Sequence, residues 1–130
     1  MALTANWFFE VAVAGGQTIR AGGEQSPETV DVAHVEVDAG AAEAVDLLPA
    51  SADGTVSLLV IRPSEFHADV AFSFEGPAGT PETFALDGPV VLIGSGSVSL
   101  LPAPPLKLWL TNDTPDPVTV EILIGRDATP

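Results

Sequence analysis

The chain alternates apolar and polar residues over much of its length, and a period of two is typical of β-strands, whose successive side chains point to opposite faces. Near the start, Trp7, Phe9, Val11 and Val13 share one side, and Gly15-Gly16 ends the segment. The other side carries Phe8, Glu10 and Ala12. This pattern predicts a strand with one wholly apolar face.

Further segments of strand character are residues 29–37, 42–48, 55–62, 69–75, 83–86, 90–93, 106–111 and 118–124. Residues 42–48 also fit a helical turn, because Ala and Glu favour helix. In residues 29–37 the apolar phase changes between Val32 and Val35. We interpret this segment as one bent strand, with a β-bulge near Ala33-His34 or with both faces partly covered.

Turn-forming residues separate these segments. Residues 55–62 are apolar on both faces, which is typical of a central strand, and Asp87-Gly88-Pro89 predicts a turn beside a sheet edge because Pro cannot donate to a ladder. Gly94-Ser95-Gly96-Ser97 is interpreted as a flexible hairpin connection. A brief extended piece over residues 98–100 and an extended, unpaired connection over residues 102–105 are expected to follow.

About eight short strands in 130 residues, with no helical heptad, favour an all-β fold. We predict a single domain over residues 1–130, an antiparallel β-sandwich of either jelly-roll or immunoglobulin-like topology. The hydrophobic fraction of 46% excludes a disordered chain.

Acidic residues dominate the charge. The 18 Asp and Glu outnumber four basic residues, and the net charge is −14. This balance excludes nucleic-acid binding, which requires cationic groups, and disfavours an anionic membrane surface as a partner. At most four acids can pair with a cation, so most should face solvent. The first 14 residues contain no Lys or Arg and include Glu10, so we expect no export signal.

Few residues could support catalysis or bind a cofactor. The chain has no Cys, no Tyr and one Lys, and we predict a non-enzymatic protein without a cofactor or metal. His34 with Glu36, and His67 with Glu65, are each two residues apart and could share a strand face, but neither pair has a third strong ligand. Residues 112–116 gather oxygen atoms as a calcium loop does, although a proline-braced turn explains them better.

The aromatic residues are the better candidates for a binding surface. Trp109 lies opposite in phase to Leu106, Leu108 and Leu110, so it should point away from the core. Large aromatic side chains contribute strongly to interfaces. We predict an interface that includes Trp7, Phe8 and Trp109, with the simpler alternative that Trp7 packs in the core.

The segments LKLWLTNDT, residues 106–114, and PVTVEILIG, residues 117–125, form a predicted closing hairpin. This hairpin resembles that of small β-sandwich virion proteins of tailed phages. The resemblance implies a structural protein that decorates or cements a capsid, or belongs to a tail, as a homo-oligomer in contact with a capsid or tail protein. It also implies a location in the virion, after assembly in the host cytoplasm.

A carbohydrate- or ligand-binding module is the alternative function. In that case Trp7 or Trp109 would stack on a sugar ring. The acidic loops would then supply a calcium site.

Overall fold

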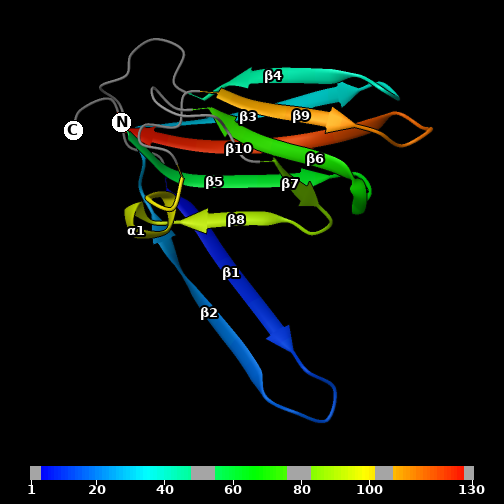
Figure 1. Cartoon of the computed structure of the whole chain (residues 1–130). Coiled ribbons are helices and arrows are strands. Elements are labelled where there is room, and N and C mark those ends of the chain that lie inside the picture. The colour runs from blue at the N-terminus through cyan, green and yellow to red at the C-terminus, as the bar shows by residue number, and fades with distance from the viewer. Residues whose placement is uncertain (1–3, 48–54, 76–82, 102–106, 128–130) are drawn as a thin grey trace.

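Two four-stranded antiparallel sheets face each other in the computed structural model, and a two-stranded hairpin projects from them (Figure 1). The structure describes residues 4–47, 55–75, 83–101 and 107–127. The elements are β1 (Ala5–Ala12), β2 (Thr18–Gln25), β3 (Thr29–Val37), β4 (Ala42–Asp46), β5 (Thr55–Pro63), β6 (His67–Glu75), β7 (Thr83–Leu86), β8 (Val90–Ile93), α1 (Ser95–Val98), β9 (Lys107–Asn112) and β10 (Val118–Asp127).

The strand order decides between the two predicted topologies. One sheet, called the first sheet, has the order β3-β10-β5-β8, and the second sheet has the order β4-β9-β6-β7. The pairs are therefore nested: β3 pairs with β10, β4 with β9, β5 with β8 and β6 with β7, all antiparallel. An antiparallel chain folded double and rolled into two sheets is a jelly roll. The predicted all-β sandwich is confirmed.

The core lies between the sheets and follows the alternation of the sequence. In β10 the inward residues are Val118, Val120, Ile122 and Ile124, all buried as expected. Other buried residues of this cluster are Val37, Leu47, Val56, Leu59, Ile61, Val70, Phe74, Leu86, Val98, Leu108 and Leu110. Each aliphatic side chain removed from water contributes about 1.5–3 kcal/mol to folding.

An irregularity in β5 moves one residue to the opposite face. The ladder between β10 and β5 shifts register between Gly125 and Arg126, so that Leu58 pairs with Gly125 and Val56 with Arg126. Val56 consequently joins the core, although alternation placed it on the same face as Leu58 and Val60. The prediction that this strand is central is confirmed, because β5 lies between β10 and β8.

Residues 29–37 have no β-bulge near Ala33-His34, which was one of the two alternatives for this segment. The pairing of β3 with β10 runs without a register shift from Thr29 to Val37. The apolar phase changes because Val32 faces outward and is 57% exposed, while Val35 packs against the core. An apolar residue on an outer face therefore produced the ambiguity.

The flexible connection predicted after β8 is wrong. Gly94 adopts a positive φ of 89°, and the short helix α1 follows it, with Ser97 Oγ donating to the carbonyl of Ile93 at 2.8 Å. Val98 ends this helix inside the core rather than forming an extended piece. No helix in the described ranges is long and apolar enough to cross a membrane.

Three other predicted segments turn out as follows. Of the predicted segment 42–48, residues Ala42–Asp46 form strand β4 and not a helical turn, and residue 48 lies outside the described residues. Asp87-Gly88-Pro89 connects β7 of the second sheet to β8 of the first, so this turn joins two sheets and does not close a hairpin. Strand β8 is an edge strand, as Pro89 implied. The connection predicted at residues 102–105 lies outside the described residues, as does Leu106.

A buried amide joins three parts of the jelly roll. Asn112 is fully buried, and its Nδ2 donates to the carbonyls of Val37 at 2.9 Å and Asp116 at 2.8 Å. Its Oδ1 accepts from the backbone N–H of Thr114 at 2.9 Å and from the Thr114 hydroxyl at 2.6 Å. Buried polar groups stabilise a fold when all their hydrogen bonds are made. Asn112 thus fixes the β9–β10 turn against the end of β3.

We predict that Asn112→Asp lowers the free energy of unfolding by at least about 3 kcal/mol. The carboxylate oxygen that replaces Nδ2 cannot donate a hydrogen bond, and it would face the two carbonyls that Nδ2 now binds. Thr114→Val is the control and should cost about 1 kcal/mol, since it removes only a hydroxyl. Urea unfolding measures both. An equal loss in the two variants would contradict the role assigned to Asn112.

The acidic residues that the structure describes lie at the surface, as predicted. None of the Asp and Glu side chains in the described ranges is buried. Each of the four basic residues lies beside one acid, in the pairs Arg20–Glu10, Arg62–Glu121, Lys107–Asp46 and Arg126–Asp31. The pairs of Arg20, Arg62 and Lys107 are exposed, and exposed pairs contribute little stability. The remaining acids repel one another through solvent.

We predict that the melting temperature rises between 0.1 and 1 M sodium chloride, because the Debye length falls from about 10 Å to about 3 Å and screens this repulsion. Sulfate is unsuitable, since it also strengthens the hydrophobic effect. Melts should be recorded at a protein concentration at which the chain is monomeric. A flat or falling melting temperature would show that the acidic charge is already compensated.

Candidate interaction surface

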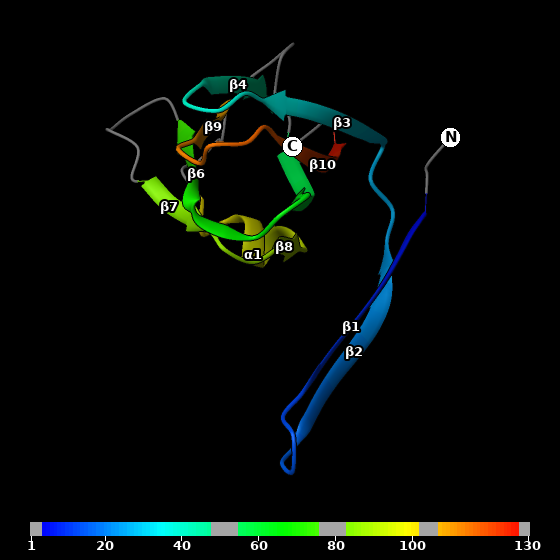
Figure 2. The ribbon, with the colours of Figure 1, turned by 90° about the vertical axis from the view of Figure 1, so that its right-hand side faces the viewer.

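The hairpin of β1 and β2, called the arm, lies outside both sheets. Ala5 pairs with Gln25 and Ala12 with Thr18 in an uninterrupted antiparallel register. Figure 2 shows the arm leaving the sandwich beside β3 and extending away from it. Within the described part of the chain, neither arm strand pairs with a third strand or packs extensively on another element. The sequence had predicted β1 but not β2.

One face of the arm is apolar except for Gln25 at its base, opposite Ala5. Cross-strand neighbours on it are Phe9 with Ala21 and Val11 with Ile19, and Trp7 lies opposite Gly23. We call Trp7, Phe9, Val11, Ile19 and Ala21 the apolar arm face. Phe9, Val11 and Ile19 are 42%, 59% and 65% exposed. A two-stranded hairpin alone in water is marginally stable, so an exposed apolar face of this kind points to a partner.

The aromatic end of this face depends on a glycine. The rings of Trp7 and Phe9 stack with centroids 6.3 Å apart, and a Cβ placed on Gly23 would lie 2.9 Å from the Trp7 ring. The indole therefore lies directly over the Gly23 backbone. An aromatic side chain that covers a cross-strand glycine compensates for the packing the glycine lacks.

The opposite arm face is mixed. It carries Glu10 and Arg20, 3.9 Å apart, and Phe8, which is 69% exposed. Trp7 and Phe8 therefore point to opposite sides of the hairpin.

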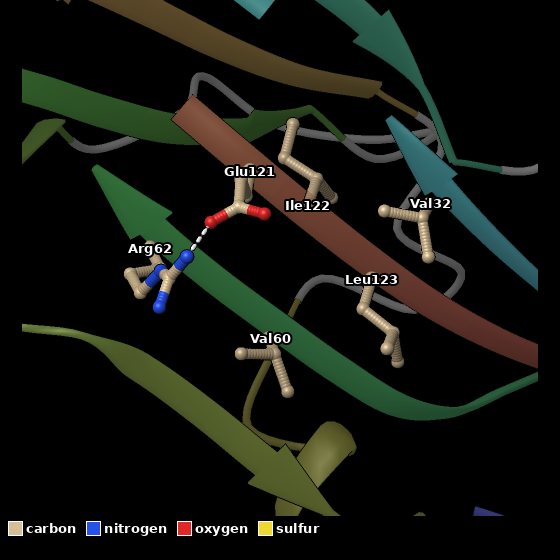
Figure 3. Close-up of a pocket in the computed structure, with 6 residues that line it drawn as sticks. All are labelled: Val32, Val60, Arg62, Glu121, Ile122 and Leu123. Atoms are coloured by element: carbon tan, nitrogen blue, oxygen red, sulfur yellow. Dashed lines mark hydrogen bonds and ion pairs between the residues drawn. The ribbon is translucent and has the colours of Figure 1, made fainter. Parts of the chain in front are cut away.

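A second exposed apolar surface crosses the outer face of the first sheet. Val32 of β3 pairs with Leu123 of β10, Leu123 with Val60 of β5, and Val60 with Val91 of β8. We call these four residues the apolar sheet row. Figure 3 shows three of them on neighbouring strands. Val32 and Val91, at the two ends, are 57% and 47% exposed, and a shallow hollow of about 220 Å³ lies over the middle of the row.

A row of charged residues borders the apolar sheet row. Glu121 accepts from Arg62 through one carboxylate oxygen (Figure 3), and its other oxygen lies 3.0 Å from His34 Nε2. His34 therefore contacts a carboxylate across the sheet, not the Glu36 that the sequence suggested. Arg62 and His34 are largely exposed, so this border is polar and solvated.

Trp109 lies on the outer face of the second sheet, as predicted. Its side chain packs beside Lys107, whose Nζ is 5.9 Å from the ring centroid, and its Nε1 donates to Glu75 at 3.3 Å. The residue is 36% exposed. Trp109 and the apolar arm face are therefore on separate surfaces.

The predicted metal-ligand pairs have other contacts. His67 Nδ1 accepts from the backbone N–H of Asp69 at 3.0 Å. The described residues contain no group of three or more His, Asp or Glu placed to hold a metal ion. In the 112–116 loop, the Asn112 oxygen is already used by Thr114, so the loop has the hydrogen bonding of a turn.

The structure thus separates the three predicted interface residues, Trp7, Phe8 and Trp109, onto three surfaces. It adds Phe9, Val11 and Ile19 to the face of Trp7. The period of two had shown the first two of these on one side. Nothing in the sequence showed that this side is left uncovered, because the same pattern is typical of core strands.

Comparison with protein-family models, with curated proteins and with solved structures finds no match to this chain.

We predict that Gly23→Ala displaces the Trp7 indole, because the new methyl group would overlap the ring. In a Trp109→Phe background, Trp7 fluorescence should become more accessible to acrylamide. Gly88→Ala is the matched control, since a Cβ there has no atom within 4 Å. Equal quenching in both variants would show that Trp7 does not rest on Gly23.

Proposed function

We propose that this protein is a non-enzymatic structural subunit of a virus particle, decorating or cementing a capsid or tail, and that the arm makes its subunit contacts. The observation that carries the proposal is the apolar arm face, which projects from the sandwich without a covering element in the described residues. Such an arm gains stability only when a neighbour covers it.

The jelly roll supports this function by analogy only. The fold occurs in viral capsid proteins, but also in lectins and cupins. The arm distinguishes these uses, because a hairpin that extends away from the sandwich presents its area to another macromolecule and does not enclose a small ligand.

Electrostatics favours the same surface. A chain of net charge −14 repels its own copies, so contacts should form where carboxylates are absent. The apolar arm face carries no charged residue. The charges of the arm are on its other face, where Glu10 and Arg20 lie beside each other.

A carbohydrate-binding module remains the second candidate, and the exposure of Trp109 on an outer sheet face favours it. An indole on a flat sheet can stack on a sugar ring. Binding to a glycan array that is lost in Trp109→Ala but kept in Val11→Asp would support this function.

We predict that the chain self-associates at micromolar concentration and that Val11→Asp raises the dissociation constant by at least about tenfold, or 1.4 kcal/mol, because it places a carboxylate on the apolar arm face. Ala12→Asp is the matched control: it adds the same charge one residue further on the opposite face and should have a smaller effect. Light scattering coupled to size-exclusion chromatography measures both.

A wild-type chain that stays monomeric at all concentrations and salt conditions would contradict self-assembly through the arm. Equal effects of the two substitutions would show that net charge, and not the apolar arm face, controls association.

A further inference from the structure

We propose that the apolar arm face docks on the apolar sheet row of a second copy of this chain, so that each copy donates one arm and receives another. This inference rests on the proposed function and specifies its contact. Both surfaces are exposed apolar groupings that run across paired strands.

The dimensions of the two surfaces agree. From Trp7 to Val11 the arm advances four residues, about 13 Å at the rise of a strand. From Val32 to Val91 the row crosses three strand spacings, about 14 Å. An arm lying across the strands of the first sheet would therefore place its apolar side chains along the whole row, as in orthogonal packing of two sheets.

The connection between β2 and β3, residues 26–28, is called the root of the arm. It explains why the receiving sheet belongs to another copy. Only residues 26–28 separate β2 from β3. Pro27 is buried and lies over Gly125, and the backbone N–H of Glu28 donates to Asp127 at 3.0 Å. To cover its own sheet, the arm would have to reverse direction within these three anchored residues. A short connection that prevents folding back favours exchange between copies.

The root of the arm also lies next to the apolar sheet row of the same copy. Leu58 and Gly125 lie on the outer face of the first sheet, two residues along the strands from Val60 and Leu123. Pro27 covers that position. A neighbour's arm on the apolar sheet row would therefore lie beside the root of the receiving arm, and the two contacts would form one buried surface.

The charges around the apolar sheet row allow the arm of a second copy to approach it, and the charged row of His34, Glu121 and Arg62 borders it on one side. The apolar sheet row carries no acid, whereas the adjoining row of His34, Glu121 and Arg62 pairs its carboxylate with a cation. Two strongly acidic copies can thus meet here without bringing unpaired carboxylates together. Apolar contact between uncharged surfaces also strengthens relative to repulsion as salt is added.

The first test compares two lysine substitutions. Leu123→Lys places a charge in the middle of the apolar sheet row, and Thr111→Lys places the same charge on the outer face of the second sheet. Both change the net charge from −14 to −13. We expect the dissociation constant to rise at least about tenfold in Leu123→Lys and not to rise in Thr111→Lys. Unchanged melting of the diluted, monomeric variants verifies that both fold.

The second test uses the absence of cysteine from the chain, so that engineered thiols have no native competitor. A Val11→Cys protein mixed with a Val32→Cys protein should form a disulfide-linked heterodimer under mild oxidation. Val11→Cys mixed with Ala44→Cys is the control, since Ala44 is exposed on the outer face of the other sheet's edge strand.

The outcomes separate the two proposals. A monomeric wild type would overturn the proposed function and this inference together. An oligomer that is unaffected by Leu123→Lys, with no preference for Val32→Cys over Ala44→Cys, would overturn only the inference. Efficient crosslinking of Val11→Cys with itself would show that arms pack on arms, and would also overturn it.

Discussion

The constraint on which this structure depends is an apolar hairpin face that none of the described residues of its own chain covers. A jelly roll can bury its hydrophobic residues between two sheets, and here the inward residues of eight strands do so. Within the described ranges the arm has no opposing sheet, and the large negative charge limits where another acidic chain can approach. These two conditions together make the uncharged apolar surfaces the natural contacts of the molecule.

The sandwich determines where the arm begins. Nested strand pairing places β3 at the edge of the first sheet, next to β10, and the short connection from β2 is anchored there by Pro27 over Gly125. Asn112 holds the opposite end of β3 to the β9–β10 turn. The edge strand that carries the arm is thus fixed at both ends, which gives the arm a rigid base.

Much of the sandwich could be predicted from alternation, because its strands bury one face. The inward residues of β10 and the outward direction of Trp109 followed directly from the period of two. The failures have physical causes. β2 was missed because its glycines serve the packing of Trp7 and weaken the strand pattern, and Val32 obscured the phase of β3 because it is an apolar residue on an outer face. The contact of His34 with Glu121 and that of Asn112 with Val37 join residues distant in sequence, so no local spacing could reveal them.

The central claim is that the arm becomes covered only by another subunit, and hydrogen exchange of its backbone amides as a function of protein concentration tests this most directly. In dilute solution the amides of β1 and β2 should exchange rapidly, because an isolated hairpin opens easily. They should become protected over the concentration range in which the mass increases, while the core strands stay protected throughout. Arm amides whose exchange does not change as the oligomer forms would contradict the account.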